Sequence, residues 1–197
     1  MDIKTEKKFL LDALHEKFKA CIACPLGNLG RINVVVGEGN PDARLMLIGE
    51  APGATEDITG RPFVGRSGKL LTNTLLSLGI ERAEIFITNI VKCRPPQNRK
   101  PTLLESFTCK NLILKKQIEI IQPKVICTLG TTATEGLLDQ KVKITAIRGS
   151  SFQYENITTI PMYHPAFILR DPKNFEQFKK DLELAIFVSR ENTCKKE

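Results

Sequence analysis

The sequence predicts an α/β protein of three layers, in which helices cover both faces of a central, mostly parallel sheet of four to five strands. Three short apolar runs have the length and composition of buried strands, namely residues 44–49 (RLMLIG), 85–91 (IFITNIV) and 124–130 (KVICTLG). Segments with helical spacing or helix-capping residues separate them. Strands that alternate with helices are typical of parallel pairing, with helices on both faces.

The first half of the chain predicts two helices around the first strand. Residues 5–20 place Phe9, Leu10, Leu14 and Phe18 on one helical face. After the first strand, residues 57–66 (DITGRPFVGR) are expected to form a loop. Ser67 is expected to cap a helix that runs to about Leu78, and Gly79 is expected to end it.

The second half predicts three further helices and two further strands. Thr102 and Glu105 form a capping box that opens a helix ending before Pro123. A short helix is expected from Thr131 or Thr132. Residues 142–148 and 157–163 are expected to be strands, and Asn174 is expected to cap a last helix over 175–190.

Length and composition are those of one soluble domain covering residues 1–197, with an N-terminal helix within 1–20 and a polar tail at 191–197. Hydrophobic residues make up 42% and charged residues 26%. The roughly 20-residue apolar run of a membrane helix is lacking, and the first ten residues, MDIKTEKKFL, do not resemble a signal peptide. We therefore expect a cytoplasmic protein with no membrane partner.

The net charge is +7, with 29 Lys and Arg against 22 Asp and Glu. A basic excess suits a polyanionic partner such as nucleic acid, because each neutralised phosphate releases a condensed counterion. Many soluble proteins are mildly basic, so the charge alone does not identify the partner.

Polar or small residues follow the predicted strands. Glu50 follows the first strand, Asn89 lies near the end of the second, Gly130 closes the third, and His164 follows the fifth. In open α/β sheets the ligand crevice lies outside the carboxyl ends of the strands. These four segments are therefore expected to meet at one site.

Four of the six cysteines have the spacing of metal ligands. Cys21 and Cys24 form a tight pair, and 15 residues separate Cys93 from Cys109. Two such pairs fit either a tetrahedral zinc or an iron–sulfur cluster, and ordinary unliganded cysteines are the alternative. Cys127 is expected to be buried in the third strand, and Cys194 to be a free thiol in the tail.

Residues 60–70 (GRPFVGRSGKL) do not form a Walker A loop, because Phe63 and Leu70 stand where that motif needs Gly and Ser or Thr. The segment is either a glycine-rich connector or a support for Phe63 as an aromatic platform. Of the two histidines, His15 is expected to be solvated on the first helix. A single histidine such as His164 is more often structural than catalytic, and spacing alone does not decide its role.

Four motifs together resemble the family 4 uracil-DNA glycosylases: GEAPGATED (49–57), RPFVGRSGKLL (61–71), TNIVKCRPP (88–96) and HPAFILR (164–170). The cysteine pattern is similar to the one that holds a 4Fe-4S cluster in that family. The resemblance runs from about Cys21 to Arg190. It implies the same three-layer α/β/α fold and a DNA repair enzyme that flips uracil out of single- or double-stranded DNA. No lysine is placed where a Schiff base is implied, so we expect a monofunctional glycosylase without lyase activity. Hydrolysis of the N-glycosidic bond would leave an abasic site. We expect a monomer.

The resemblance also implies residue roles. The cluster ligands would be Cys21, Cys24, Cys93 and Cys109. The residues around the base would be Gly49, Glu50 and Ala51 at its border, Phe63 on its face, Asn89 at its Watson–Crick edge, Glu56 where a thymine methyl would lie, and His164 beside the departing ring. In catalysis, Glu50 would position the attacking water and stabilise the cationic sugar, and His164 would donate to uracil O2.

Two alternatives remain open at this point. A DNA-binding module or polymerase accessory without activity would share the fold, but phosphate binding gains nothing from a carboxylate such as Glu50 in the cleft. A zinc-stabilised α/β enzyme acting on nucleotides would share the cysteines, and a colourless rather than brown protein would identify it.

Overall fold

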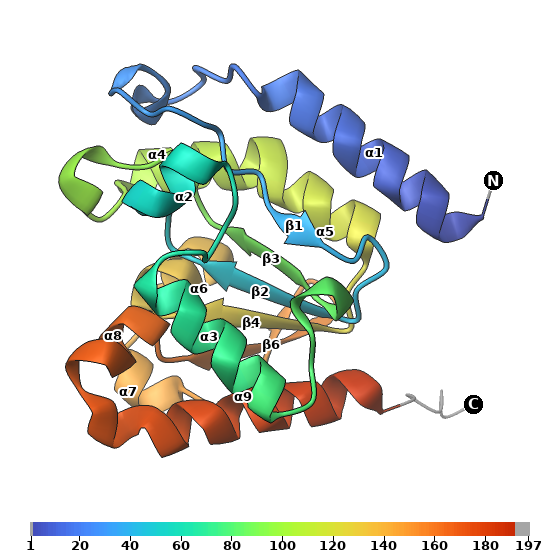
Figure 1. Ribbon diagram of the computed structural model, residues 1–197, viewed down its shortest axis with the longest axis vertical. Coiled ribbons are helices and arrows are strands. Elements are labelled where there is room, and N and C mark those ends of the chain that lie inside the picture. Colours follow the sequence, from blue (N-terminus) through green and yellow to red (C-terminus); the bar gives the residue numbers. More distant parts are fainter. Residues whose placement is uncertain (1, 192–197) are drawn as a thin grey trace.

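The computed structural model describes residues 2–191 and is built around a sheet that has six strands within that range (Figure 1). The strand order is β1-β3-β2-β4-β6-β5. The strands are β1 (Glu38–Gly39), β2 (Leu45–Gly49), β3 (Phe86–Asn89), β4 (Val125–Leu129), β5 (Phe152–Tyr154) and β6 (Ile157–Met162). Neighbours among β3, β2, β4 and β6 pair in parallel, whereas β1 and β5 pair antiparallel at the two edges. The predicted mostly parallel sheet is confirmed, but the expected four to five strands are corrected to six.

Helices cover both faces of the sheet, as Figure 1 shows. They are α1 (Ile3–Phe18), α2 (Ala54–Thr59), α3 (Arg66–Ser77), α4 (Leu103–Cys109), α5 (Lys115–Ile121), α6 (Thr131–Leu138), α7 (Ile144–Ile147), α8 (Pro165–Arg170) and α9 (Phe175–Arg190). Successive residues of β2 point to opposite faces, so Leu45 and Leu47 pack with α3, α8 and α9, whereas Met46 and Ile48 pack with α4, α5 and α6. These two cores confirm the three-layer α/β/α architecture.

The prediction of a strand over residues 142–148 was wrong. That segment contains the short helix α7, in which Ile144 and Ile147 lie three residues apart on one helical turn. Ile144 packs against the core on the face of the sheet that α3, α8 and α9 cover. The edge of the sheet is taken instead by β5, which pairs antiparallel with β6 through the register Tyr154↔Ile157. A tight hairpin of this kind closes locally, and that leaves the preceding segment outside the sheet.

Two expectations between β2 and α3 also needed correction. Part of the expected loop at 57–66 belongs to α2, which begins after Gly53. The N-cap of α3 is Gly65 rather than Ser67, so Ser67 lies inside the first turn of the helix. The expected C-terminal end is confirmed, because Gly79 follows the C-cap Leu78 with a φ of 71°.

The remaining helices largely agree with the sequence. The capping box of Thr102 and Glu105 is present at α4. The predicted helix continues to Ile121, through a π-helical turn at Lys110–Leu114. Asn174 stands at the N-cap of α9, but its side chain donates to Asp171 instead of capping the helix.

In α1, Leu14 and Phe18 pack against the core, whereas Phe9 and Leu10 are exposed. Within residues 2–191, no helix has the length and apolar character needed to cross a membrane. The tail from residue 192 onward, including Cys194, lies outside the described residues.

The carboxyl ends of the parallel strands lie at one edge of the sheet. Gly49 and Asn89 are register partners at the ends of β2 and β3. Gly130, which follows β4, donates its backbone N–H to Met162 O at 2.8 Å, at the end of β6 just before His164. This edge carries the site.

Candidate active site

A cavity of about 220 Å³ opens at the carboxyl ends of β2, β3 and β6. Six of the residues predicted for the base-binding and catalytic site line it: Glu50, Ala51, Glu56, Phe63, Asn89 and His164. The seventh, Gly49, lies immediately behind the lining. A Cβ atom at Gly49 would collide with both the Asn89 amide and the Phe63 ring, so only glycine lets these two side chains meet at the end of β2.

Asn89 supplies an amide at the end of β3. The residue is 1% exposed, and its Oδ1 has no hydrogen-bond partner among residues 2–191. Buried side-chain polar atoms are almost always paired, because an unpaired one loses its hydration without compensation. An acceptor of this kind in the wall of a cavity is poised for a ligand that carries a donor.

Phe63 presents an aromatic ring opposite His164, with 5.7 Å between the ring centroids. Its φ is 52°, in the left-handed region that costs free energy for any residue with a side chain. Glu56 supports the following residues, because its Oε1 accepts from the backbone N–H of Val64 at 2.9 Å and of Gly65 at 2.7 Å. The Glu56 carboxylate is thus fixed beside the cavity rather than free to rotate.

His164 caps the N-terminus of α8. Its Nδ1 accepts from the backbone N–H of Ala166 at 3.0 Å, so the proton of the neutral ring must lie on Nε2. Burial lowers the pKa of His164 to about 4, the nearby Arg170 adds to that effect, and Glu56 opposes it. At neutral pH the ring is therefore uncharged, with Nε2–H as its donor.

Glu50 follows β2 at the boundary between two cavities. A second cavity of about 280 Å³ lies next to the first, lined by residues of the β4–α6 turn and of α8. Glu50 and His164 line both. The carboxylate and the imidazole therefore lie where one cavity meets the other.

Sequence reasoning missed several lining residues. They are Pro52, Gly53, Ser67, Pro95, Asn98, Arg99 and Ala166. Arg99 comes from the basic loop at 92–101 and forms a two-pronged ion pair with Glu105, at 2.7 and 2.9 Å. The basic composition of the loop was visible in the sequence, whereas the pairing that orients Arg99 was not.

The four predicted cluster cysteines come together. Cys21, Cys24, Cys93 and Cys109 line one small cavity between the segment after α1 and the start of the π-helical turn. Burial raises the pKa of Cys93 to about 12 and that of Cys109 to about 11, and the neighbouring thiols add to both shifts. No group of three His, Cys, Asp or Glu side chains within residues 2–191 is placed to hold a single metal ion.

The other two sequence expectations for these residue types are confirmed. Cys127 is fully buried in β4, where burial raises its pKa. His15 is exposed on α1.

Comparisons with known proteins identify the family of this chain. The family model described as "Uracil DNA glycosylase superfamily" matches residues 36–185. The chain is 50% identical over 167 residues to the type-4 uracil-DNA glycosylase of Thermotoga maritima, covering 84% of this chain and 86% of that protein. It is 44% identical over 193 residues to the type-4 enzyme of Sulfurisphaera tokodaii, covering 91% and 87%. With the type-4 enzyme of Pyrobaculum aerophilum the identity is 41% over 182 residues, covering 88% and 92%. The chain therefore belongs to the uracil DNA glycosylase superfamily and, within it, to the type-4 uracil-DNA glycosylases.

Proposed function

We propose that this protein is a DNA repair enzyme that flips uracil out of DNA and hydrolyses its N-glycosidic bond, leaving an abasic site. The type-4 relatives are named for that activity, and they match this chain over most of its length and of their own. One observation carries the proposal at the level of residues. A buried amide with an unpaired acceptor shares one cavity of about 220 Å³ with an aromatic ring and a neutral imidazole.

Asn89 would read the edge of the flipped base. Uracil presents N3–H as a donor and O4 as an acceptor, and an amide side chain can accept and donate at once. The unpaired Asn89 Oδ1 suits N3–H. Extruding the base costs a few kcal/mol, and stacking on Phe63 would return roughly 1–3 kcal/mol.

Glu56 would exclude thymine. Its carboxylate lines the cavity and is held by the Val64 and Gly65 amides, so it cannot easily move aside for an added methyl group. A fixed group discriminates better than a mobile one, because yielding to the wrong base would break both hydrogen bonds.

Glu50 and His164 would serve the two developing charges of the reaction. Breaking the bond between C1′ and N1 leaves positive charge on the sugar and negative charge on uracil. Glu50, at the boundary of the two cavities, would position the attacking water and stabilise the sugar cation. Water oxygen bonds to C1′ while the electrons of the broken bond leave with N1. The proton that the water loses passes to solvent, and the uracil anion takes up a proton from solvent at N1. His164 Nε2–H would stabilise uracil O2 by a hydrogen bond, without giving up its proton.

We further propose that Cys21, Cys24, Cys93 and Cys109 hold a 4Fe-4S cluster. All four line one cavity, and four cysteine thiolates are the usual ligands of such clusters. The cluster would supply a cross-link between two distant segments.

A uracil-containing oligonucleotide tests the activity. We expect alkali-labile breaks at uracil and none at thymine in a matched strand, with no break before alkali. In single-turnover assays, Glu50→Gln, Asn89→Ala and His164→Ala should each slow excision by about 10²-fold or more. His15→Ala, a change at the exposed histidine, is the control and should match the wild type.

Two results would contradict these assignments. Wild-type rates in all three site variants would remove the proposed roles. Tight binding of the oligonucleotide without any alkali-labile product would instead favour the DNA-binding module.

A further inference from the structure

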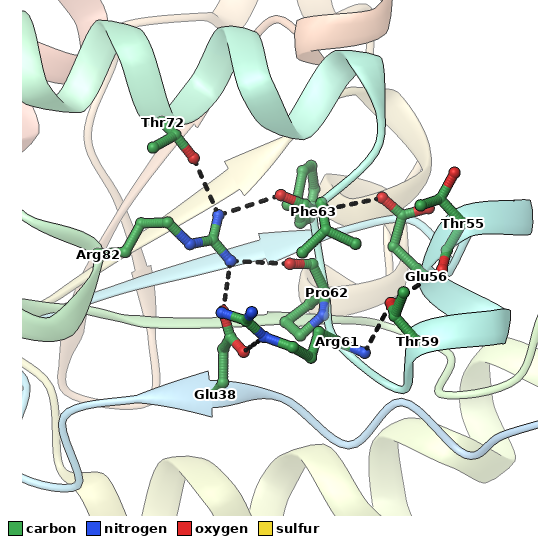
Figure 2. A network of polar contacts seen from close by, with 10 residues as sticks. Glu38, Thr55, Glu56, Thr59, Arg61, Pro62, Phe63, Thr72 and Arg82 are labelled. Atoms are coloured by element: carbon green, nitrogen blue, oxygen red, sulfur yellow. Dashed lines mark hydrogen bonds and ion pairs between the residues drawn. The ribbon is translucent and has the colours of Figure 1, made fainter.

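The guanidinium of Arg82 lies beside the segment that carries Pro62 and Phe63, as Figure 2 shows. Arg82 belongs to a short 3-10 turn, Arg82–Glu84, just before β3. Its Nη1 donates to Phe63 O at 3.1 Å and to Thr72 Oγ1 at 3.2 Å, and its Nη2 donates to Pro62 O at 2.8 Å. One side chain thus holds two consecutive backbone carbonyls of the segment and the helix that follows it.

Glu38, on the edge strand β1, holds Arg82 in place. Its Oε1 accepts from Arg82 Nη2 at 2.6 Å, and its Oε2 accepts from Arg61 Nε at 2.7 Å. Burial alone would raise the pKa of Glu38, but the hydrogen bonds from Arg61 and Arg82 outweigh it and lower the pKa below its ordinary value. The Arg82 side chain is 18% exposed and that of Glu38 is 27% exposed, so this pair is partly shielded from water.

The segment needs such support because its backbone is strained. A φ of 52° at Phe63 is unfavourable for a residue with a side chain and persists only where neighbouring groups enforce it. Charged side chains form hydrogen bonds with the backbone on both sides of the Phe63 ring position. Arg82 binds the carbonyls of Pro62 and Phe63, whereas Glu56 binds the amides of Val64 and Gly65.

We propose that Arg82, held by Glu38, is a positioning residue for base recognition, which keeps the Phe63 ring in its stacking position before DNA binds. The inference rests on the proposed function, in which Phe63 stacks on the flipped base. Arg82 is not among the residues that line the cavity, so it acts on the base only through Phe63.

We call the contacts of Arg82 with the carbonyls of Pro62 and Phe63 the clamp. Removing the clamp should weaken base binding without changing the contacts made to DNA. If the stacking conformation is populated only in part, the apparent affinity for the base falls by that fraction. For Arg82→Met we expect free uracil to inhibit about tenfold less strongly and single-turnover excision to slow by a similar factor. Affinity for an abasic-site duplex, which offers no base to stack, should change less than twofold.

Arg61→Met is the matched control. It removes the other ion pair to Glu38, but the Arg61 side chain does not hold the carbonyls of Pro62 or Phe63. Uracil inhibition should stay within twofold of the wild type in this variant. Equal losses in both variants would overturn the proposal, because they would assign the effect to the loss of a positive charge near Glu38 rather than to the contacts of Arg82 with the carbonyls of Pro62 and Phe63.

A double-mutant comparison separates positioning from general stability. In the Phe63→Ala background, adding Arg82→Met should cost less than twofold more in excision rate. Losses that multiply would show that Arg82 acts independently of Phe63 and would overturn the proposal. Urea titrations will show whether Arg82→Met is folded. If it is not, the milder Glu38→Gln change should weaken uracil inhibition and slow excision in the same way, by smaller factors.

Hydrogen exchange gives a readout that does not depend on excision. The amides of Val64 and Gly65 should exchange faster in Arg82→Met than in the wild type, while β4 amides keep their protection. Unchanged exchange would exclude the clamp even in an active enzyme. A wild-type protein that cannot excise uracil would instead refute the proposed function. The exchange rates of the Val64 and Gly65 amides would then still show whether Arg82 holds the segment.

Discussion

At the scale of single residues, His164 shows how one backbone contact decides what an imidazole can do. Because Nδ1 accepts from the Ala166 amide, the ring can act as a donor only through Nε2. Its pKa of about 4 keeps it neutral above pH 5. We expect nitrogen NMR to show an unprotonated Nδ1 and a protonated Nε2 from pH 5 to 8. A ring that titrates near 6.5 would contradict this assignment.

The low pKa of His164 also makes the free energy of unfolding depend on pH. The ordinary pKa of histidine is about 6.5, so between pH 6.5 and 4 the unfolded chain binds the proton more readily than the folded protein does. The free energy of unfolding should therefore fall as the pH drops through that window, by at most about 3 kcal/mol from this group. In His164→Asn, which can still cap α8, this part of the decline should vanish in urea titrations.

Residues differed in how far the sequence could place them. Glu50, Asn89 and His164 stand at or just after the carboxyl ends of parallel strands, which lie at one edge of the sheet, so their proximity was predictable. Arg99 sits in a loop whose course depends on its pairing with Glu105, and that pairing is a tertiary contact. Arg82 belongs to no motif, and its partners on β1 and beside Phe63 come from distant parts of the chain.

At the scale of elements, the turn after β4 packs against the turn after β6. Gly130 has a φ of 88°, and a Cβ there would lie 2.9 Å from His164 Cβ. Gly130→Ala should therefore both strain its own backbone and push His164 away from the cavity. We expect a loss of stability of about 1 kcal/mol or more and a drop in excision of about 10²-fold.

Gly79 provides the control for that change. Its φ is 71°, but among the described residues nothing lies within 4 Å of the position of an added Cβ. Gly79→Ala should lose a similar amount of stability through backbone strain while excision stays near the wild-type rate. Equal activity in the two variants would show that the contact between the two turns does not position His164.

Elements in the centre of the sheet were predicted better than those at its edges. β2 and β4 are buried on both faces and read as continuous apolar runs. The edge strands β1 and β5 have two and three residues, too few for any periodicity to show. The last edge of the sheet is formed by β5 rather than by residues 142–148, because β5 forms a hairpin with β6. No local sequence pattern in 142–148 reveals that pairing.

At the scale of the whole molecule, the cysteine cavity is connected to the base pocket through Lys92. The backbone N–H of Lys92 donates to Cys109 Sγ at 3.3 Å, and its Nζ donates to Asn89 O at 2.7 Å. A change in the cysteine loops therefore has a short path to the end of β3. This connection would couple the proposed cluster to the position of Asn89 without any redox step.

Removal of iron should accordingly loosen one side of the molecule rather than unfold it evenly. We expect about four irons per chain in anaerobically purified protein, retained in Cys127→Ala and lost in Cys93→Ala. Without iron, amides in residues 20–36 and 92–109 should exchange faster, because the two segments lose their cross-link, while amides of α9 on the opposite face keep their protection. Excision should fall along with the exchange protection near Asn89. Uniform loss of protection over both faces would mean that the cluster stabilises the fold as a whole, and iron-free protein with full activity would exclude the connection through Lys92.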